Sequence, residues 1–192
     1  MKIGIGVQGP SDREFWFKVL HKYFQHCKFD VRNLKSQNKL VRESAALLDT
    51  FRSAGYRAGF IILDRDATPC VTAVIDQFKD TIKSEARKPT HSRYLYVCVA
   101  IKELEAWYLA DQKAINAVLP KVSYTAPQDT STLNAKAKLK ELWQRQHGSH
   151  SAFNKIELAK LMNSKFSPHE AKIRSASFSY FWKSLESVTK VA

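Results

Sequence analysis

Long apolar runs and cysteines are both scarce in this chain of 192 residues. No apolar run approaches the roughly 20 residues that span a bilayer, and the apolar start is too short for a signal peptide, so we expect a cytoplasmic protein with no membrane role. The cysteines, Cys27, Cys70 and Cys98, are far apart and odd in number, which fits neither a disulfide framework nor a zinc site. The sequence also contains no HExxH metal motif and no GxxxxGK[ST] phosphate loop.

Acidic residues are also scarce in comparison with basic ones. Lys and Arg total 31 against 18 Asp and Glu, a formal charge of +13. Residues 113–192 hold 13 basic and only 5 acidic residues, so the excess is concentrated there. Such a charge favours an anionic partner, with nucleic acid ahead of an anionic membrane surface, although a merely soluble basic protein is also compatible with it. With 44% hydrophobic and 11% aromatic residues, the chain can bury a real core.

Apolar patterns alternate between strands and helices up to about residue 112. The continuous run at 58–63 is typical of a strand covered on both faces, as in a parallel sheet. Ser11 and Glu14 have the spacing of a capping box at a helix start. The predicted strands are 3–7, 29–34, 58–63 and 94–101, and the predicted helices are 11–25, 40–51, 71–82 and 103–119. This alternation predicts an α/β fold with a doubly wound, mainly parallel sheet.

Strand signals stop after residue 112, and the rest of the chain is helical in pattern. We therefore expect a core of residues 1–112 and a basic helical extension of residues 113–192 packed on it. Within the extension, the predicted helices are 133–146, 154–163, 168–174 and 178–188.

The most informative short motif is Asp64-x-Asp66, directly after the apolar strand at 58–63. Residues two apart in an extended chain point the same way, so the two carboxylates repel each other. A divalent cation such as Mg²⁺ removes that repulsion, and α/β sheets bind ligands beyond the carboxyl ends of their strands. The alternative is an ordinary turn in which Arg65 pairs with either carboxylate.

Two further strand ends carry polar residues. Gly9 permits close approach of the backbone after the first strand, and the helix that follows can attract an anion at its N-terminus. Glu103 and Glu105 follow the strand at 94–101. Both features are equally compatible with ordinary local structure, because strand–turn–helix junctions are common and acidic residues suit the first turn of a helix.

Together these stretches resemble a TOPRIM domain, and more closely a small bacterial TOPRIM-like family of unknown function (domain of unknown function 4276) related to OLD-type nucleases. The resemblance covers nearly the whole chain, and its most specific part is the stretch Glu-Leu-Glu-Ala-Trp at 103–107. It implies that Asp64, Asp66 and Glu105 hold Mg²⁺ or Mn²⁺.

The resemblance also implies roles in acid–base chemistry and in nucleic-acid binding. The TOPRIM glutamate falls on Gln8, which can coordinate but cannot take a proton at neutral pH, so Asp12, Glu14 or Glu105 would act in its place. Basic side chains of the family-like stretches would contact phosphates, or else form a solvated helix face: Lys102, Lys136 and Lys155.

The leading hypothesis is therefore a metal-dependent nuclease or related phosphotransfer protein acting on DNA or RNA. By resemblance to OLD-type systems, its setting would be defence against phage or mobile DNA, with an OLD-type (AAA-type) ATPase as partner. The alternative, favoured by Gln8, is a catalytically reduced nucleic-acid-binding or regulatory module. A receiver-like or nucleotide-binding domain is a third hypothesis, but it does not explain the basic helical extension of residues 113–192.

Overall fold

A four-stranded parallel sheet organises the structure, a computed structural model that describes residues 1–65, 70–86 and 95–190. The strands are β1 (Lys2–Val7), β2 (Lys28–Asn33), β3 (Ala58–Asp64) and β4 (Leu95–Ala100), in the order β2-β1-β3-β4. Every pairing is parallel, with Ile5 opposite both Val31 and Phe60. The predicted α/β fold with a parallel sheet is confirmed.

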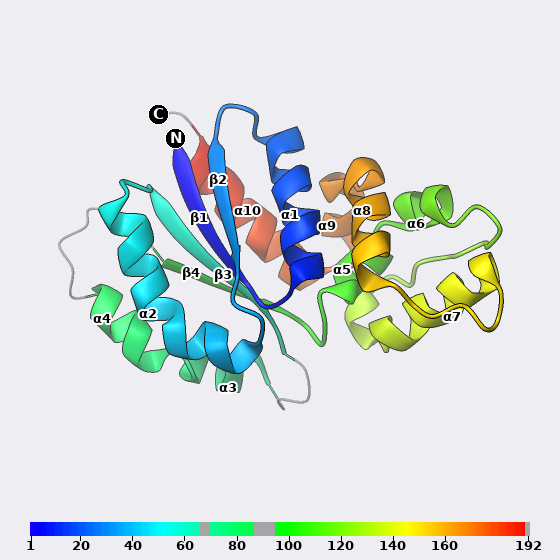
Figure 1. Ribbon diagram of the computed structural model, residues 1–192, viewed down its shortest axis with the longest axis horizontal. Helices are drawn as coiled ribbons and strands as arrows, with labels where there is room; N and C mark the ends of the chain where they lie inside the picture. Colours follow the sequence, from blue (N-terminus) through cyan, green and yellow to red (C-terminus); the bar gives the residue numbers. More distant parts are fainter. Residues whose placement is uncertain (66–69, 87–94, 191–192) are drawn as a thin grey trace.

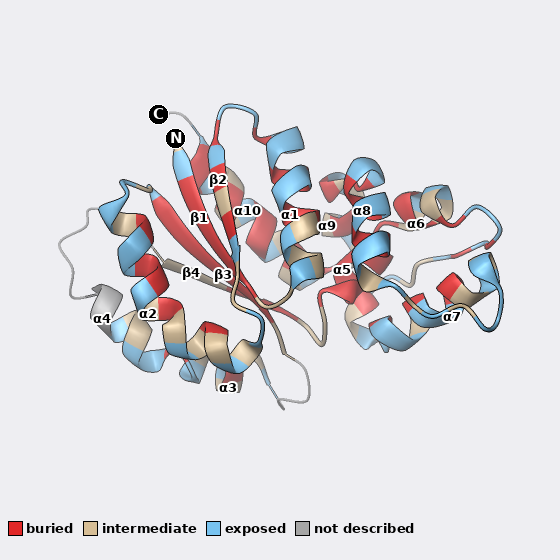
Figure 2. Ribbon diagram, viewed as in Figure 1, coloured by how far each residue is buried: buried red, intermediate tan, exposed pale blue. Residues whose placement is uncertain are grey.

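Helices cover both faces of the sheet (Figure 1). One face carries α1 (Pro10–Tyr23) and α10 (Ala176–Thr189), and the other carries α2 (Gln37–Ser53), α3 (Val71–Asp76) and α4 (Lys79–Ala86). The central strands β1 and β3 are consequently buried along almost their whole length, whereas the outer strands β2 and β4 are only partly buried (Figure 2). Gly4 allows α2 to lie close to the sheet, because a Cβ there would come within 2.2 Å of the Phe51 ring.

The remaining helices form a group beyond the carboxyl end of the sheet and alongside α1 (Figure 1). They are α5 (Glu105–Leu109), α6 (Gln112–Val118), the 3₁₀ turn η1 (Thr130–Thr132), α7 (Ala135–His147), α8 (Lys155–Lys165) and α9 (Pro168–Arg174). α8 packs on α1, and the Tyr23 hydroxyl donates to the Phe166 carbonyl at 2.8 Å. One hydrophobic cluster runs from β1 through α1 and α5 to α10.

Three local expectations were wrong. The single helix expected over 71–82 is two helices, because hydrogen bonds from Gln77 to Val74 (3.2 Å) and from Phe78 to Ile75 (2.9 Å) tighten the turn between them. The helix expected over 103–119 is also divided, since the Asp111 carboxylate caps a new helix by accepting the Ala114 N–H at 3.0 Å.

The third error concerns the start of α1. Its N-cap is Gly9, with Pro10 at the first helical position, and not Ser11. Asp12 performs the reciprocal half of the capping box that Glu14 was expected to perform, because its carboxylate accepts the Gly9 N–H at 2.9 Å. This places the Asp12 carboxylate at the turn that follows β1. Within the described residues, no helix combines the length and the apolar character needed to cross a membrane.

Candidate functional site

The strand order places the site. From β1 the chain passes to β2 on one side, whereas from β3 it passes to β4 on the other, so the ends of β1 and β3 border a topological switch point. Ligands of open α/β sheets bind outside the carboxyl ends of the strands at such a point. Asp64 is the last residue of β3, and the segments that follow β1 and β4 carry Asp12 and Glu105, respectively.

A small pocket lies where the first turns of α1, α5 and α8 meet. The pocket is a cavity of about 10 Å³, which leaves room for a single water-sized occupant. Its lining residues are Ser11, Asp12, Leu104, Glu105, Tyr108, Phe153, Lys155 and Leu158. Three helix N-termini therefore converge on a pocket that contains two carboxylates, one phenol and one ammonium group.

Glu105 and Lys155 form an ion pair inside this pocket. Glu105 is only 6% exposed, and Lys155 Nζ contacts its Oε1. Burial alone would lower the pKa of Lys155. The negative charge of Glu105, with smaller contributions from Asp64 and Glu103, outweighs this effect of burial, so the pKa of Lys155 is raised above its ordinary value. The Lys155 ammonium thus lies in the field of three carboxylates.

Asp12 has a strongly raised pKa. Burial and, to a smaller extent, the Glu105 charge raise its pKa to about 6, although the Gly9 N–H and the Ser11 hydroxyl (3.2 Å) favour the charged form. A carboxyl group with such a pKa can exchange a proton near neutral pH.

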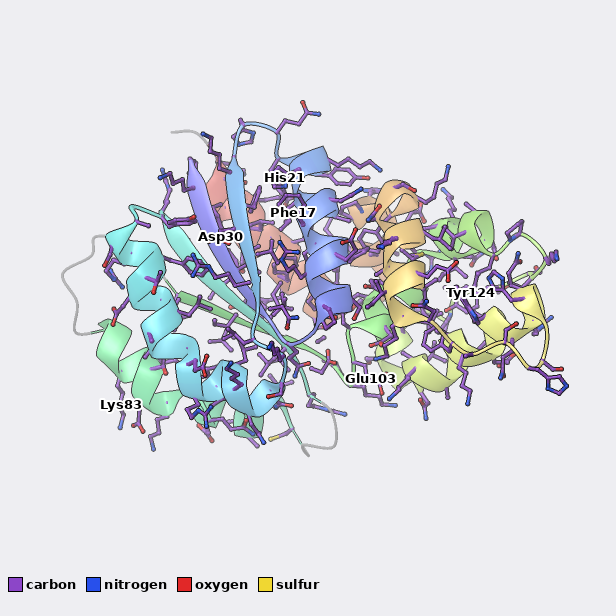
Figure 3. The ribbon with its side chains drawn as sticks, in the orientation of Figure 1. Phe17, His21, Asp30, Lys83, Glu103 and Tyr124 are labelled. Atoms are coloured by element: carbon purple, nitrogen blue, oxygen red, sulfur yellow. The ribbon has the colours of Figure 1, made fainter. Side chains whose placement is uncertain are left out.

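Asp64 and Glu103 flank the pocket from the strand ends. Asp64 Oδ1 accepts the Leu104 N–H at 2.7 Å, which ties the end of β3 to the start of α5. Glu103, labelled in Figure 3, lies at the junction between the sheet and the helices beyond it. Burial and the Glu105 charge raise the pKa of Glu103, and the charges of Lys155 and Lys136 oppose this. Its Oε2 is buried without a hydrogen-bond partner among the described residues.

Tyr108 is the residue that sequence reasoning missed. It is 3% exposed, and its buried hydroxyl has no hydrogen-bond partner among the described residues. Burial, followed by the charges of Asp12, Glu105 and Asp64, raises its pKa well above the usual value. The phenol thus shares two carboxylate neighbours with Lys155, Glu105 and Asp64, and its hydroxyl donates to none of the described residues. The sequence signal that could have identified Tyr108 is its spacing from Glu105, because residues three apart share a helix face.

A polar contact behind the site fixes the orientation of α5. The Ser177 hydroxyl at the start of α10 accepts the Trp107 indole N–H at 2.9 Å and the Ile101 N–H at 3.4 Å. The Trp107 ring stacks on Phe181 at 5.6 Å and meets Trp16 edge-on at 5.7 Å. These contacts bury Trp107 completely and hold the neighbouring Glu105 toward the pocket.

Several residues selected from the sequence lie apart from the pocket or outside the described residues. Gln8 directs its amide toward Gln37 on α2, with Nε2 3.4 Å from Oε1. Lys102 Nζ donates to the Thr132 carbonyl at 3.0 Å, and Lys136 is exposed at the start of α7. Asp66, the expected partner of Asp64, lies in the stretch 66–69, which the structure does not describe.

Comparison with protein families supplies a match over residues 7–186, to the family described as a domain of unknown function (DUF4276). The chain belongs to this family. The DUF4276 region contains every pocket residue and reaches into α10. Neither a curated protein nor a solved structure matches the chain.

The donor chemistry of this DUF4276 site suits a hard cation. Mg²⁺ and Mn²⁺ take carboxylate oxygens and water, and the described residues that would hold such an ion are Asp64 and Glu105. Within residues 1–65, 70–86 and 95–190, no three His, Cys, Asp or Glu side chains form a ready metal cage. Lys155 supplies the local positive charge instead.

The Asp12 carboxyl gives a first prediction, on stability against pH. Its pKa is about 6 in the folded protein and 3.8 in the reference state, so the native state binds the proton more tightly. The stabilisation is complete below about pH 4 and is lost as the pH rises through 6. At 1.4 kcal/mol per pKa unit the loss is at most about 3 kcal/mol, and solvent at the exposed edge of the carboxyl group reduces it.

Asp12→Asn removes this titration while its amide oxygen still accepts the Gly9 N–H. We expect the variant to be more stable than the wild type in urea unfolding at pH 8, and the difference to shrink toward pH 4.5. A variant that is equally destabilised at both pH values would show that Asp12 acts only as a helix cap.

Proposed function

We propose that the protein is a Mg²⁺- or Mn²⁺-dependent nuclease, or a related phosphotransfer protein, that acts on DNA or RNA. The observation that carries the proposal is the group of Asp12, Asp64 and Glu105 at the switch point of a parallel sheet, around a Tyr108 hydroxyl that has no partner among the described residues. A relation to the TOPRIM domains of OLD-type nucleases, a setting in phage or mobile-DNA defence, and an OLD-type ATPase partner belong to the same proposal.

Each residue has a distinct task in this proposal. A divalent ion on Asp64 and Glu105 would activate water and neutralise charge on the phosphate. Asp12 exchanges the proton that Gln8 cannot take, since its carboxyl group titrates near neutral pH. The Tyr108 hydroxyl donates a hydrogen bond to an oxygen of the substrate. Lys102, Lys136 and the formal +13 charge favour the phosphate backbone as a ligand.

The direct test measures cleavage of labelled single-stranded DNA, supercoiled plasmid and RNA with Mg²⁺, with Mn²⁺ and with EDTA. We expect cleavage that depends on the metal and is lost in Glu105→Gln. Absence of cleavage of every substrate in the wild type would refute the nuclease.

Two observations favour the second candidate, a nucleic-acid-binding module with little or no catalysis. Lys155 already neutralises Glu105, and Gln8 replaces the acid expected after β1. This candidate predicts metal-independent binding of oligonucleotides by the wild type, and cleavage, if any, only in Gln8→Glu.

Tyr108→Phe gives a prediction that separates function from folding. Removing a buried hydroxyl that has no partner in the part of the chain that the structure describes leaves stability unchanged or slightly higher. If the hydroxyl donates to the substrate, cleavage falls by about tenfold or more. The measurements are the initial rate of cleavage and the urea midpoint.

Tyr124→Phe is the matched control. Tyr124 is also buried, but its hydroxyl donates to the Leu109 carbonyl at 3.0 Å. We expect it to lose about 1 kcal/mol of stability and to keep the wild-type cleavage rate. Equal rates for Tyr108→Phe and the wild type would exclude Tyr108 from the reaction.

A further inference from the structure

The position of Lys155 points to a built-in competitor for the metal. We propose that Lys155 is a tethered counter-ion: its ammonium group closes the carboxylate cluster of the metal-free protein, and a divalent cation displaces it to a phosphate of the nucleic acid. This inference rests on the proposed function and deepens it, because it makes binding of metal and binding of phosphate cooperative.

The first support is the charge of the cluster. Glu105 is almost fully buried, and Lys155 is the cation in contact with it. Asp64 and Glu103 also attract the same ammonium group. A divalent cation on these oxygens would take over the neutralisation that Lys155 provides, and two cations in one small pocket repel each other.

The second support is the freedom of the lysine side chain. Its carboxylate partner is buried, but the Lys155 side chain is itself 41% exposed. Lys155 is the first residue of α8, whose backbone is held by Asn154 capping the Glu157 N–H at 3.1 Å. The side chain can therefore leave the pocket by rotating about its own bonds, with no change in the helix.

The third support is the location of the lysine on its helix. A positive group in the first turn of an 11-residue helix opposes the helix dipole, so the carboxylates hold it there. Once Glu105 binds a metal, the released ammonium group and the N-terminus of α8 both favour an anion beside the pocket. The backbone phosphate of a nucleic acid provides that anion.

The experiment measures Mn²⁺ affinity by calorimetry at pH 8, without nucleic acid, for the wild type and Lys155→Met. Methionine keeps most of the apolar stem and removes the charge. A neighbouring charge shifts the proton affinity of a carboxylate by about tenfold or more, so we expect Lys155→Met to bind Mn²⁺ about tenfold more tightly. Lys155→Arg restores the charge and should return the affinity toward that of the wild type.

The second readout is the salt dependence of oligonucleotide binding by the same proteins. With Mn²⁺ present, the slope of log K against log salt should be smaller by about 0.7 to 0.9 in Lys155→Met than in the wild type, since one phosphate contact is lost. Without metal, the two slopes should agree, because Lys155 is held by Glu105. Lys138→Met is the matched control, as Lys138 pairs with Glu141 on the surface of α7 at 2.9 Å.

The outcomes separate the two proposals. Mn²⁺ binding by the wild type with equal or weaker binding by Lys155→Met would overturn the counter-ion role and leave the nuclease standing. No Mn²⁺ binding by either protein would overturn both. Tighter binding by Lys138→Met as well would show a general charge effect and would also overturn the specific role of Lys155.

Discussion

Asp64→Asn is expected to reduce metal-dependent cleavage by about 10²- to 10³-fold while the protein stays folded. Asp64 Oδ1 accepts the Leu104 N–H at 2.7 Å, and an asparagine oxygen can accept the same bond, so the link between β3 and α5 remains. The substitution removes the negative charge that a divalent cation requires. Cleavage is measured under single-turnover conditions, and folding by the urea transition.

The matched control is Asp76→Asn at the end of α3, which also removes one carboxylate, but from an exposed position. It should keep the wild-type rate, so any loss specific to Asp64→Asn reflects the site and not the net charge. Full activity in Asp64→Asn would show that Asp64 does not hold the metal. The proposed site would then have no metal ligand from the end of β3.

The second large effect is structural. Asp111→Ala is expected to lower the free energy of unfolding by about 3 kcal/mol, because two backbone donors lose their acceptor inside the protein. Asp111 is fully buried, its Oδ1 accepts the Ala114 N–H at 3.0 Å and its Oδ2 accepts the Ser167 N–H at 2.6 Å. One carboxylate thus caps α6 and joins it to the start of α9.

An exposed cap of the same chemistry provides the comparison. Asp129 Oδ1 accepts the Ser131 N–H at 2.8 Å at the protein surface. Asp129→Ala should cost less than about 1 kcal/mol, since water replaces the carboxylate. Chemical denaturation measures the free energy of unfolding of both variants. Similar losses of stability in the two variants would show that burial of Asp111 adds nothing to the strength of its hydrogen bonds.

The strands and the fold class could be predicted from the sequence because the sheet is covered on both faces. A short continuous apolar run such as 58–63 is typical of a strand in such a sheet, and β3 was predicted to within one residue. The interrupted helices were not predicted. Asp111 stands in an unbroken helical pattern, and the sequence does not show that its carboxylate caps a new helix at Ala114 while also accepting the Ser167 N–H, 56 residues away.

The acids of the candidate site could be predicted from the sequence, whereas the basic and aromatic groups beside them could not. Asp12, Asp64 and Glu105 lie at or after the ends of three different strands, so their position at one edge follows from the parallel topology. The ion pair of Lys155 with Glu105 joins residues 50 positions apart and has no local signature. Tyr108 gave no signal of function, since an aromatic residue on a buried helix face is ordinarily part of the core.

The account depends on a divalent cation binding where Lys155 now contacts Glu105. The most direct measurement is anomalous diffraction from crystals of the protein soaked in Mn²⁺. We expect a peak between the Asp64 and Glu105 carboxylates, beside the Tyr108 hydroxyl, with Lys155 turned out of the pocket. A map with no peak there, and with Lys155 still bound to Glu105 at saturating Mn²⁺, would contradict it.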